Sequence, residues 1–235
     1  MATRSRAKRR KLPWYLRPFK WLLWFILVSV VWVAIYAVVP PPVTITMLTD
    51  GNGITKDWTR LSGIDRNMVR AAIAAEDGKF CSHDGFDREA IEQAIERNAK
   101  GKRMRGGSTI SQQTAKNVFL WQGSGWTRYI RKVPEVWFTF LIEKIWGKRR
   151  IMEVYLNVAE TGLGTYGVEA GAQRYFKHGA GKLTPAEAAR IAAILPLHKK
   201  REAVSPSGFT RRYGNSIRAQ IGVVGRDGLD RCVYQ

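Results

Sequence analysis

Acidic residues are scarce in this chain of 235 residues, which has 19 Asp and Glu against 39 Lys and Arg. Such a basic excess requires an anionic partner, for example nucleic acid, an anionic membrane surface or a phosphorylated substrate. Cysteine is scarce too, because only Cys81 and Cys232 are present. In an oxidising compartment these two can form one disulfide, and otherwise they are independent thiols. The length suits a membrane anchor and one domain, and no internal repeat is present.

Charge is absent from residues 21–39, a run of 19 mostly apolar residues. Because this length spans the hydrocarbon of a bilayer, we predict a transmembrane helix there. A cleaved signal peptide would have a shorter apolar core and a small-residue cleavage site, whereas three prolines follow here. Residues 1–20 form a basic tail with eight Lys or Arg and no acid. This asymmetry predicts a cytoplasmic N-terminus and a domain outside the cytoplasm, where nucleic acid is not an expected partner.

The rest of the chain has the apolar pattern of helices. Residues 40–64 mix Pro, Thr, Gly and Asp with short apolar pieces, and we interpret them as a linker. Asp65 is the expected N-cap of a helix that ends near Gly78, which puts Glu76 in its last turn. Further helices are predicted over 88–99, 132–145 and 151–157. Two more have a capping signal at their start: one from Thr109, with Gln112 three residues later, through Asn117, and one over 184–195, with Glu187 three residues after Thr184. The predicted fold class is mainly α, with one domain over 65–235.

Three segments contain residues suited to catalysis or binding. Glu76 and Asp77 end a helix, and a half-buried carboxylate there has its pKa raised toward the range of proton transfer. Residues 106–113 (GGSTISQQ) present amides and hydroxyls at a helix start, where phosphate or sugar oxygens bind. Residues 131–135 (RKVPE) place two cations beside a carboxylate. Taken singly, the simpler interpretations are a solvated acidic pair, a capped glycine turn and a surface salt bridge.

Residues 118–129 (VFLWQGSGWTRY) are apolar and aromatic, with glycines interspersed. Such a segment is either a core strand or turn, or a flap that enters the bilayer surface. The basic loop that precedes Gly107 has no regular pattern.

Together the motifs resemble the peptidoglycan glycosyltransferases, the domain found in class A penicillin-binding proteins. The matching residues, in order, are E-D-x-x-F-x-x-H-x-G from Glu76, G-G-S-T-I-x-Q-Q from Gly106, R-K-x-x-E from Arg131 and I-x-E-x-Y-x-N from Ile151. The similar stretch runs from about 65 to 196. No S-x-x-K, S-D-N and K-T-G set of a transpeptidase follows. The chain is therefore similar to the monofunctional members, which implies a lysozyme-like, two-lobed helical domain at the bacterial inner membrane.

The resemblance implies a polymerase that transfers the growing lipid-linked glycan to the GlcNAc 4-hydroxyl of lipid II. The linkage inverts from α to β-1,4, and undecaprenyl pyrophosphate leaves. Glu76 corresponds to the general base, and Glu135 to the second glutamate, which orients the donor end or a pyrophosphate-bound Mg or Mn ion. No cofactor is required, and cell-division or elongation proteins are candidate partners. The implied substrate-binding residues are Asp77, Phe80, His83, Ser108, Thr109, Gln112, Gln113, Lys116, Arg131, Lys132 and Arg149.

Two other classes of protein share some of these features. A cell-wall hydrolase or lytic transglycosylase also acts on glycan with a glutamate, but it has no pyrophosphate to neutralise and no need for so many cations. A membrane-anchored scaffold would use the domain only to hold other wall-assembly proteins. In that case Glu76 would be dispensable.

Overall fold

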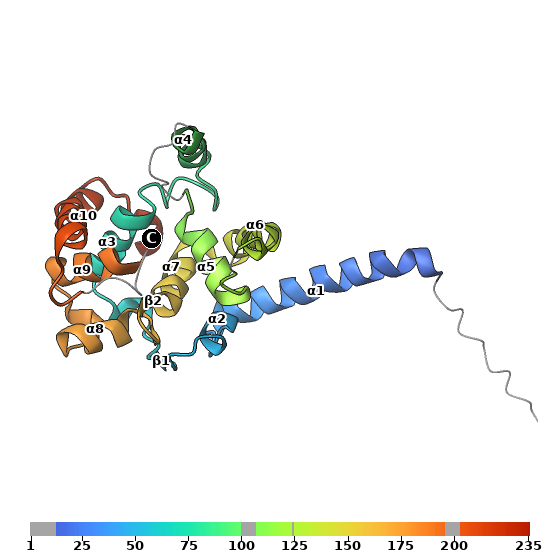
Figure 1. Ribbon diagram of the computed structural model, residues 1–235, viewed down its shortest axis with the longest axis horizontal. Coiled ribbons are helices and arrows are strands. Elements are labelled where there is room, and N and C mark those ends of the chain that lie inside the picture. Colours follow the sequence, from blue (N-terminus) through green and yellow to red (C-terminus); the bar gives the residue numbers. More distant parts are fainter. Residues whose placement is uncertain (1–12, 100–106, 124, 196–202) are drawn as a thin grey trace, which may run out of the picture.

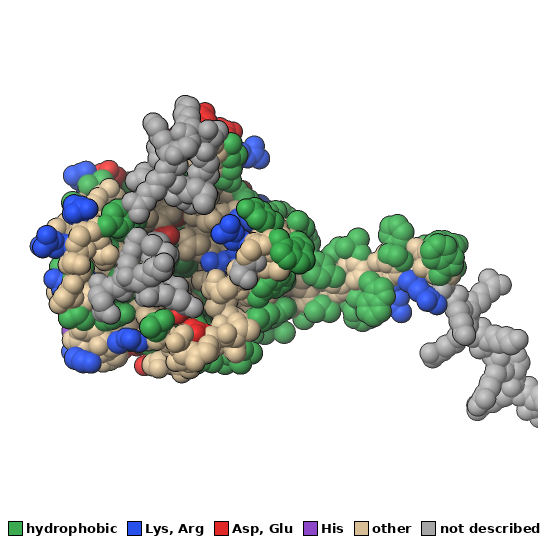
Figure 2. Space-filling view, in the orientation of Figure 1, with side chains coloured by type: hydrophobic (Ala, Val, Ile, Leu, Met, Phe, Trp, Pro, Cys, Tyr) green, Lys and Arg blue, Asp and Glu red, His purple; other side chains and the backbone are tan. Residues whose placement is uncertain are grey.

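The apolar segment near the N-terminus forms one long helix, α1 (Arg17–Val38), preceded by the 3-10 turn η1 (Trp14–Leu16). The structure is a computed structural model that describes residues 13–99, 107–123, 125–195 and 203–235. By length and composition, Trp14–Val38 is able to cross a membrane, and most of its side chains are exposed. Figures 1 and 2 show it extending from the helical domain with an apolar surface. Most of the basic tail and the loop 100–106 lie outside the described residues.

The C-terminal half of α1 is bound to the domain by polar contacts. The indole nitrogen of Trp137 donates to Ser29 Oγ at 2.9 Å, and that of Trp146 donates to the Val33 carbonyl at 2.7 Å. The guanidinium of Arg150 donates to carbonyl oxygens at the end of the helix. Because these donors contact the helix at three successive positions along its length, its direction relative to the domain is fixed.

The segment 40–64, which we interpreted as a linker, is integrated with the domain. It contains α2 (Ile45–Leu48), β1 (Thr55–Lys56) and η2 (Leu61–Gly63). Met47 and Leu61 are buried in the core. β1 is parallel to β3 (Thr165–Tyr166), which is antiparallel to β2 (Glu160–Gly162), so the strand order is β1-β3-β2.

The helices of the domain pack in two groups, seen side by side in Figure 1. The first comprises α3 (Arg66–Glu76), α9 (Pro185–Ile194) and α10 (Gly208–Arg226), and the second comprises α5 (Ile110–Phe119), α6 (Thr127–Ile145) and α7 (Gly147–Val158). Small side chains allow the close packing of the first group, since buried alanines line α3 and α9. The predicted fold class, a mainly α, lysozyme-like domain with an N-terminal apolar helix, is confirmed.

Local sequence signals place several helices correctly. Asp65 Oδ1 accepts a hydrogen bond from the Asn67 amide at 2.8 Å and caps α3 as predicted. The helix ends at Glu76, two residues before the predicted Gly78, and Glu76 lies in its last turn as predicted. The predicted capping box of Thr109 and Gln112 begins α5. That of Thr184 begins α9, and α4 (Arg88–Ala99) has the predicted bounds. These signals succeed because a cap and its helix are adjacent in sequence.

Other elements differ from the prediction. Pro134 lies inside α6, which begins at Thr127, and α7 begins at Gly147, before the predicted 151. In the described part of the segment 118–129 no residue is in a strand: residues 118–120 are core, whereas Trp126 and Tyr129 are 71% and 72% exposed. The prediction did not include three elements that complete the domain, α8 (Val168–Phe176), η3 (Ala180–Lys182) and α10, nor the short C-terminal helix α11 (Arg231–Tyr234).

We expect Asp65→Ala to lower the free energy of unfolding by about 1 kcal/mol, because the helix that carries Glu76 loses its cap. Thermal unfolding of the full chain in detergent, followed by circular dichroism, measures this. Asp57→Ala is the matched control, since Asp57 is exposed and lies outside any described helix. Equal midpoints for the two variants would contradict the capping role.

Candidate active site

The side chain of Glu76 connects the two groups of helices. It lies half-buried at the C-terminus of α3, and its Oε2 accepts a hydrogen bond from Gln113 Nε2 of α5 at 2.8 Å. Figure 2 shows a recess in the helical domain, in which acidic and basic side chains are visible. The predicted base and one predicted substrate-binding residue are therefore in direct contact.

The loop 77–85, here called the motif loop, is held by the buried carboxylate of Asp77. Its oxygens accept hydrogen bonds from His83 Nε2 at 2.9 Å and from the Ile110 amide at 3.0 Å. His83 Nδ1 accepts from the Gly85 amide at 3.1 Å, so the proton is on Nε2. Gly85 has φ +85°, and a Cβ there would lie 2.8 Å from Thr139 Cγ2, so the turn requires glycine. Asp77 thus joins the end of α3, the motif loop and the start of α5.

A buried ion pair between Lys148 and Glu143 also supports the motif loop. Lys148 Nζ donates to the His83 carbonyl at 2.6 Å and to Glu143 Oε1 at 2.8 Å. The same ammonium group lies 4.7 Å from the ring centroid of Phe80, which is fully buried. Ser111 donates to Glu143 as well. Sequence reasoning missed Glu143 and Ser111, because neither contact is between sequence neighbours.

Lys116 lies on α5, three residues beyond Gln113, and therefore on the same face of the helix. Burial lowers the pKa of its ammonium group, and nearby Arg131 lowers the pKa further. The charges of Glu135 and Glu76 oppose this change, whereas Lys132 adds to it. The structure thus brings these five predicted charged residues into one cluster.

Glu135 is buried and paired with both cations of its motif. Lys132 Nζ donates to Glu135 Oε1 at 2.6 Å, and Arg131 Nε lies 3.6 Å from Glu135 Oε2. Arg131 also donates through Nη1 to the Trp121 carbonyl at 3.0 Å, and it is buried itself. Half of the Lys132 side chain is exposed, so its charge faces solvent and is available to an anion. The surface salt bridge of the simpler interpretation is instead a buried network.

The residues around Glu135 do not form a metal site by themselves. Both of its carboxylate oxygens are next to cations, which compete with a metal ion for them. In the described ranges, no group of three His, Cys, Asp or Glu side chains has the arrangement of a metal site. We use no metal in the mechanism, and dependence on Mg or Mn stays a prediction.

The remaining predicted site residues have different surroundings. Thr109 and Gln112 are buried and form the capping box of α5, while Ser108 is exposed at its start. Phe80 is core, as described above. Arg149 donates through Nη1 to the Val233 carbonyl at 3.0 Å, so it contacts the C-terminal segment. Their roles in substrate binding stay predictions.

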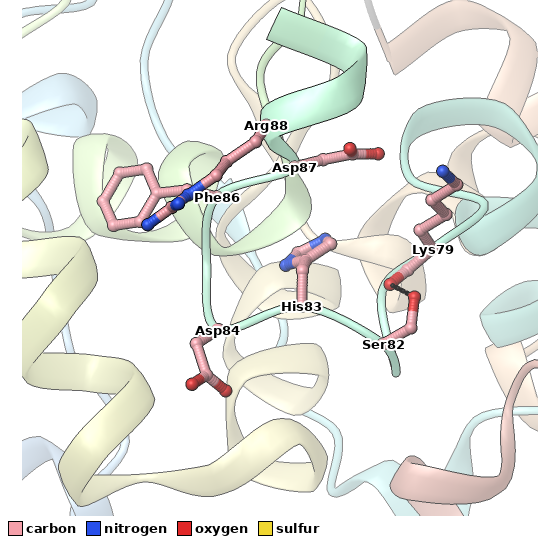
Figure 3. Close-up of a pocket in the computed structure, with 7 residues that line it drawn as sticks. All are labelled: Lys79, Ser82, His83, Asp84, Phe86, Asp87 and Arg88. Atoms are coloured by element: carbon pink, nitrogen blue, oxygen red, sulfur yellow. Dashed lines mark hydrogen bonds between the residues drawn. The ribbon is translucent and has the colours of Figure 1, made fainter.

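A cavity of about 460 Å³ lies at the motif loop. Figure 3 shows the residues that line it, with His83 among them pointing toward their centre. Its described lining is Lys79, Ser82, His83, Asp84, Phe86, Asp87 and Arg88. Glu76, Lys116 and Glu135 are not among these residues, so the cavity and the charged cluster are different places on the domain.

Comparison with known proteins gives one consistent result. A family model described as "Transglycosylase" matches residues 44–219. A "Biosynthetic peptidoglycan transglycosylase" of Caulobacter vibrioides is 50% identical over 216 residues, which cover 90% of this chain and 93% of that protein. Proteins with the same description are 44% identical over 220 residues in Pseudomonas aeruginosa (90% and 94% covered) and 42% over 226 in Xanthomonas axonopodis pv. citri (89% and 91%).

We expect Asp77→Ala to destabilise the protein by about 1–3 kcal/mol, because it leaves the buried His83 Nε2 and the Ile110 amide without their acceptor. The unfolding midpoint of the full chain in detergent measures the loss. Asp84→Ala, in the same loop but with a side chain that is 87% exposed, is the matched control and should change the midpoint little. A midpoint for Asp77→Ala equal to that of the control would contradict the bracing role.

Proposed function

The chain belongs to the peptidoglycan transglycosylase family and is a glycosyltransferase, and from this premise we propose that it polymerises glycan strands from lipid II. The observation that carries the proposal is the cluster in which two carboxylates, Glu76 and Glu135, share a site with Lys116, Arg131 and Lys132. A base and an anion-binding group are what transfer from a pyrophosphate-linked donor requires.

In the proposed step, Glu76 takes the proton from the GlcNAc 4-hydroxyl of lipid II. That oxygen attacks the anomeric carbon of the MurNAc at the reducing end of the growing strand. The bond from this carbon to the pyrophosphate breaks, undecaprenyl pyrophosphate leaves, and the α linkage becomes β-1,4. Support for Glu76 as the base comes from its fixed position, because Gln113 Nε2 holds one of its carboxylate oxygens.

The negative charge that develops on the leaving pyrophosphate requires cations. Lys132 is half exposed and Lys116 partly so, which suits both for contact with this group. Arg131 is buried and holds Glu135 in place. Because both oxygens of Glu135 are engaged with cations, we assign it the task of orienting them and the donor end, not that of a nucleophile. Arg149 stays a candidate from the sequence only.

We also propose a location: the inner membrane, with a single pass, a cytoplasmic N-terminus and a periplasmic domain. The basic residues before the span support this orientation. A second support is the exposed apolar face of α6, next to α1, where Trp126, Tyr129, Ile130 and Val133 are all more than half exposed. Aromatic and aliphatic side chains beside a membrane helix favour contact with the bilayer surface. There the site meets lipid-linked substrates.

Incubation of the purified protein with lipid II tests the proposal. We expect glycan strands to lengthen and one undecaprenyl pyrophosphate to be released for each glycosidic bond formed. Absence of both products would overturn the polymerase function, and shortened fragments from added glycan would favour the hydrolase.

We expect Glu76→Gln to lower kcat by about 10²- to 10⁴-fold, the usual contribution of a general base, while lipid II binding is retained. Polymerisation rates and a binding assay with labelled lipid II measure the two effects. Glu92→Gln, an exposed position on α4, is the matched control. Full activity of Glu76→Gln would favour the non-catalytic scaffold.

The lowered pKa of Lys116 predicts a limit to activity on the alkaline side. Lys116 has to be protonated to act as a cation, and with a lowered pKa it loses its proton at a lower pH than an ordinary lysine. On the alkaline side, kcat/KM should therefore begin to fall at a lower pH than the pKa of an ordinary lysine would give. Lys116→Arg should move this fall to higher pH, because a guanidinium keeps its charge, whereas the exposed Lys182→Arg should not. An unchanged profile for Lys116→Arg would contradict the assignment.

A further inference from the structure

The two cysteines of the chain form a disulfide between the motif loop and the C-terminus. Cys81 lies in the motif loop and Cys232 in α11, 151 residues later, with their Cα atoms 5.5 Å apart. The Cys232 amide also donates to Cys81 Sγ at 3.3 Å. We call residues 227–235 the C-terminal strap, and Figure 1 shows this end of the chain beside α3 and α7.

Noncovalent contacts join the strap to the same elements that carry the active site. Asp230 is buried and lies 2.8 Å from Arg70 Nε of α3. Val233 is fully buried, and its carbonyl accepts the bond from Arg149 of α7. A Cβ at Gly225, just before the strap, would lie 2.6 Å from the Arg70 guanidinium, so a side chain there would make the guanidinium shift.

Two of these contacts lie on α3 and α7, which adjoin Glu76 and the motif loop. α3 ends at Glu76, the motif loop begins with Asp77, and α7 supplies Lys148, which bonds to the loop at the His83 carbonyl. The strap therefore crosses from α3 to α7 and is covalently attached to the loop between them.

We propose that Cys81 and Cys232 are positioning residues, whose disulfide fastens the strap to the motif loop and so keeps Glu76 in its catalytic geometry. This inference rests on the proposed function. It implies that the polymerase activity depends on oxidation of the two cysteines to the disulfide. Formation of the bond joins the two Sγ atoms and removes two protons and two electrons. A disulfide donor, such as an oxidoreductase outside the cytoplasm or oxidised glutathione in vitro, accepts them and becomes two thiols.

Hydrogen exchange tests the positioning directly, without any assay of activity. The full chain is compared in detergent before and after reduction with dithiothreitol, and thiol titration checks that two thiols appear. We expect faster exchange in the motif loop, at the amides of Phe80, Ser82 and Gly85, which are hydrogen-bonded within it. Exchange in α6 is the internal reference for global unfolding. Unchanged exchange in the loop after reduction would overturn the proposal.

Steady-state kinetics with lipid II test the consequence for catalysis. At a temperature where circular dichroism shows a folded protein, reduction should lower kcat roughly tenfold, since small misplacements of a catalytic group are costly, and change KM less than about twofold. Reoxidation with oxidised glutathione should restore the wild-type rate. The double variant Cys81→Ser, Cys232→Ser should have the lowered rate from the start and be insensitive to both reagents.

The two proposals fail in different ways. If the oxidised wild-type protein polymerises and reduction leaves kcat unchanged, the positioning role is wrong and the function stands. If the oxidised protein forms no glycan, the proposed function is wrong, and hydrogen exchange alone decides whether the disulfide holds the motif loop.

Discussion

The carboxylate of Asp77 is buried where α3, the motif loop and α5 meet. Burial of a charged group is costly unless hydrogen bonds replace its water, and the Ile110 amide and His83 Nε2 provide them. The same bonds determine the site. Glu76 is the preceding residue, and Gln113 lies in the first turn of α5, so satisfying Asp77 brings the two side chains to hydrogen-bonding distance. The position of Glu76, the proposed base, thus follows from the solvation requirement of its neighbour.

Charge of both signs is required in the adjacent cluster. A buried Glu135 without partners would be costly, and Lys132 and Arg131 supply opposite charge on either side. Burial lowers the pKa of Lys116, and repulsion from the neighbouring cations lowers it further. An anionic ligand would relieve this repulsion. A surplus of positive charge that is only partly neutralised inside the protein is suited to a group such as pyrophosphate, and it agrees with the basic composition of the whole chain.

Hydrogen bonds connect α1 to the helices that carry residues of the site. α1 is bound by indole and guanidinium donors from α6 and α7, and these are the helices that carry Glu135 and Lys148. In the proposed membrane location, a helix fixed in this way determines which face of the domain meets the bilayer. The exposed apolar side chains of α6 lie at that face. For a lipid-linked substrate, such an orientation limits the search for the site to the plane of the membrane.

The sequence by itself determined the features that depend on neighbours along the chain: the apolar span, the caps at Asp65 and Thr109, and the motifs that identify the family. A cap or an apolar run acts within a few residues, so its signal is local. Only the tertiary structure decided which distant groups meet. Cys81 and Cys232 were left open as a pair, and Glu143 was missed, because contacts between residues far apart in sequence arise only when packed helices bring them together.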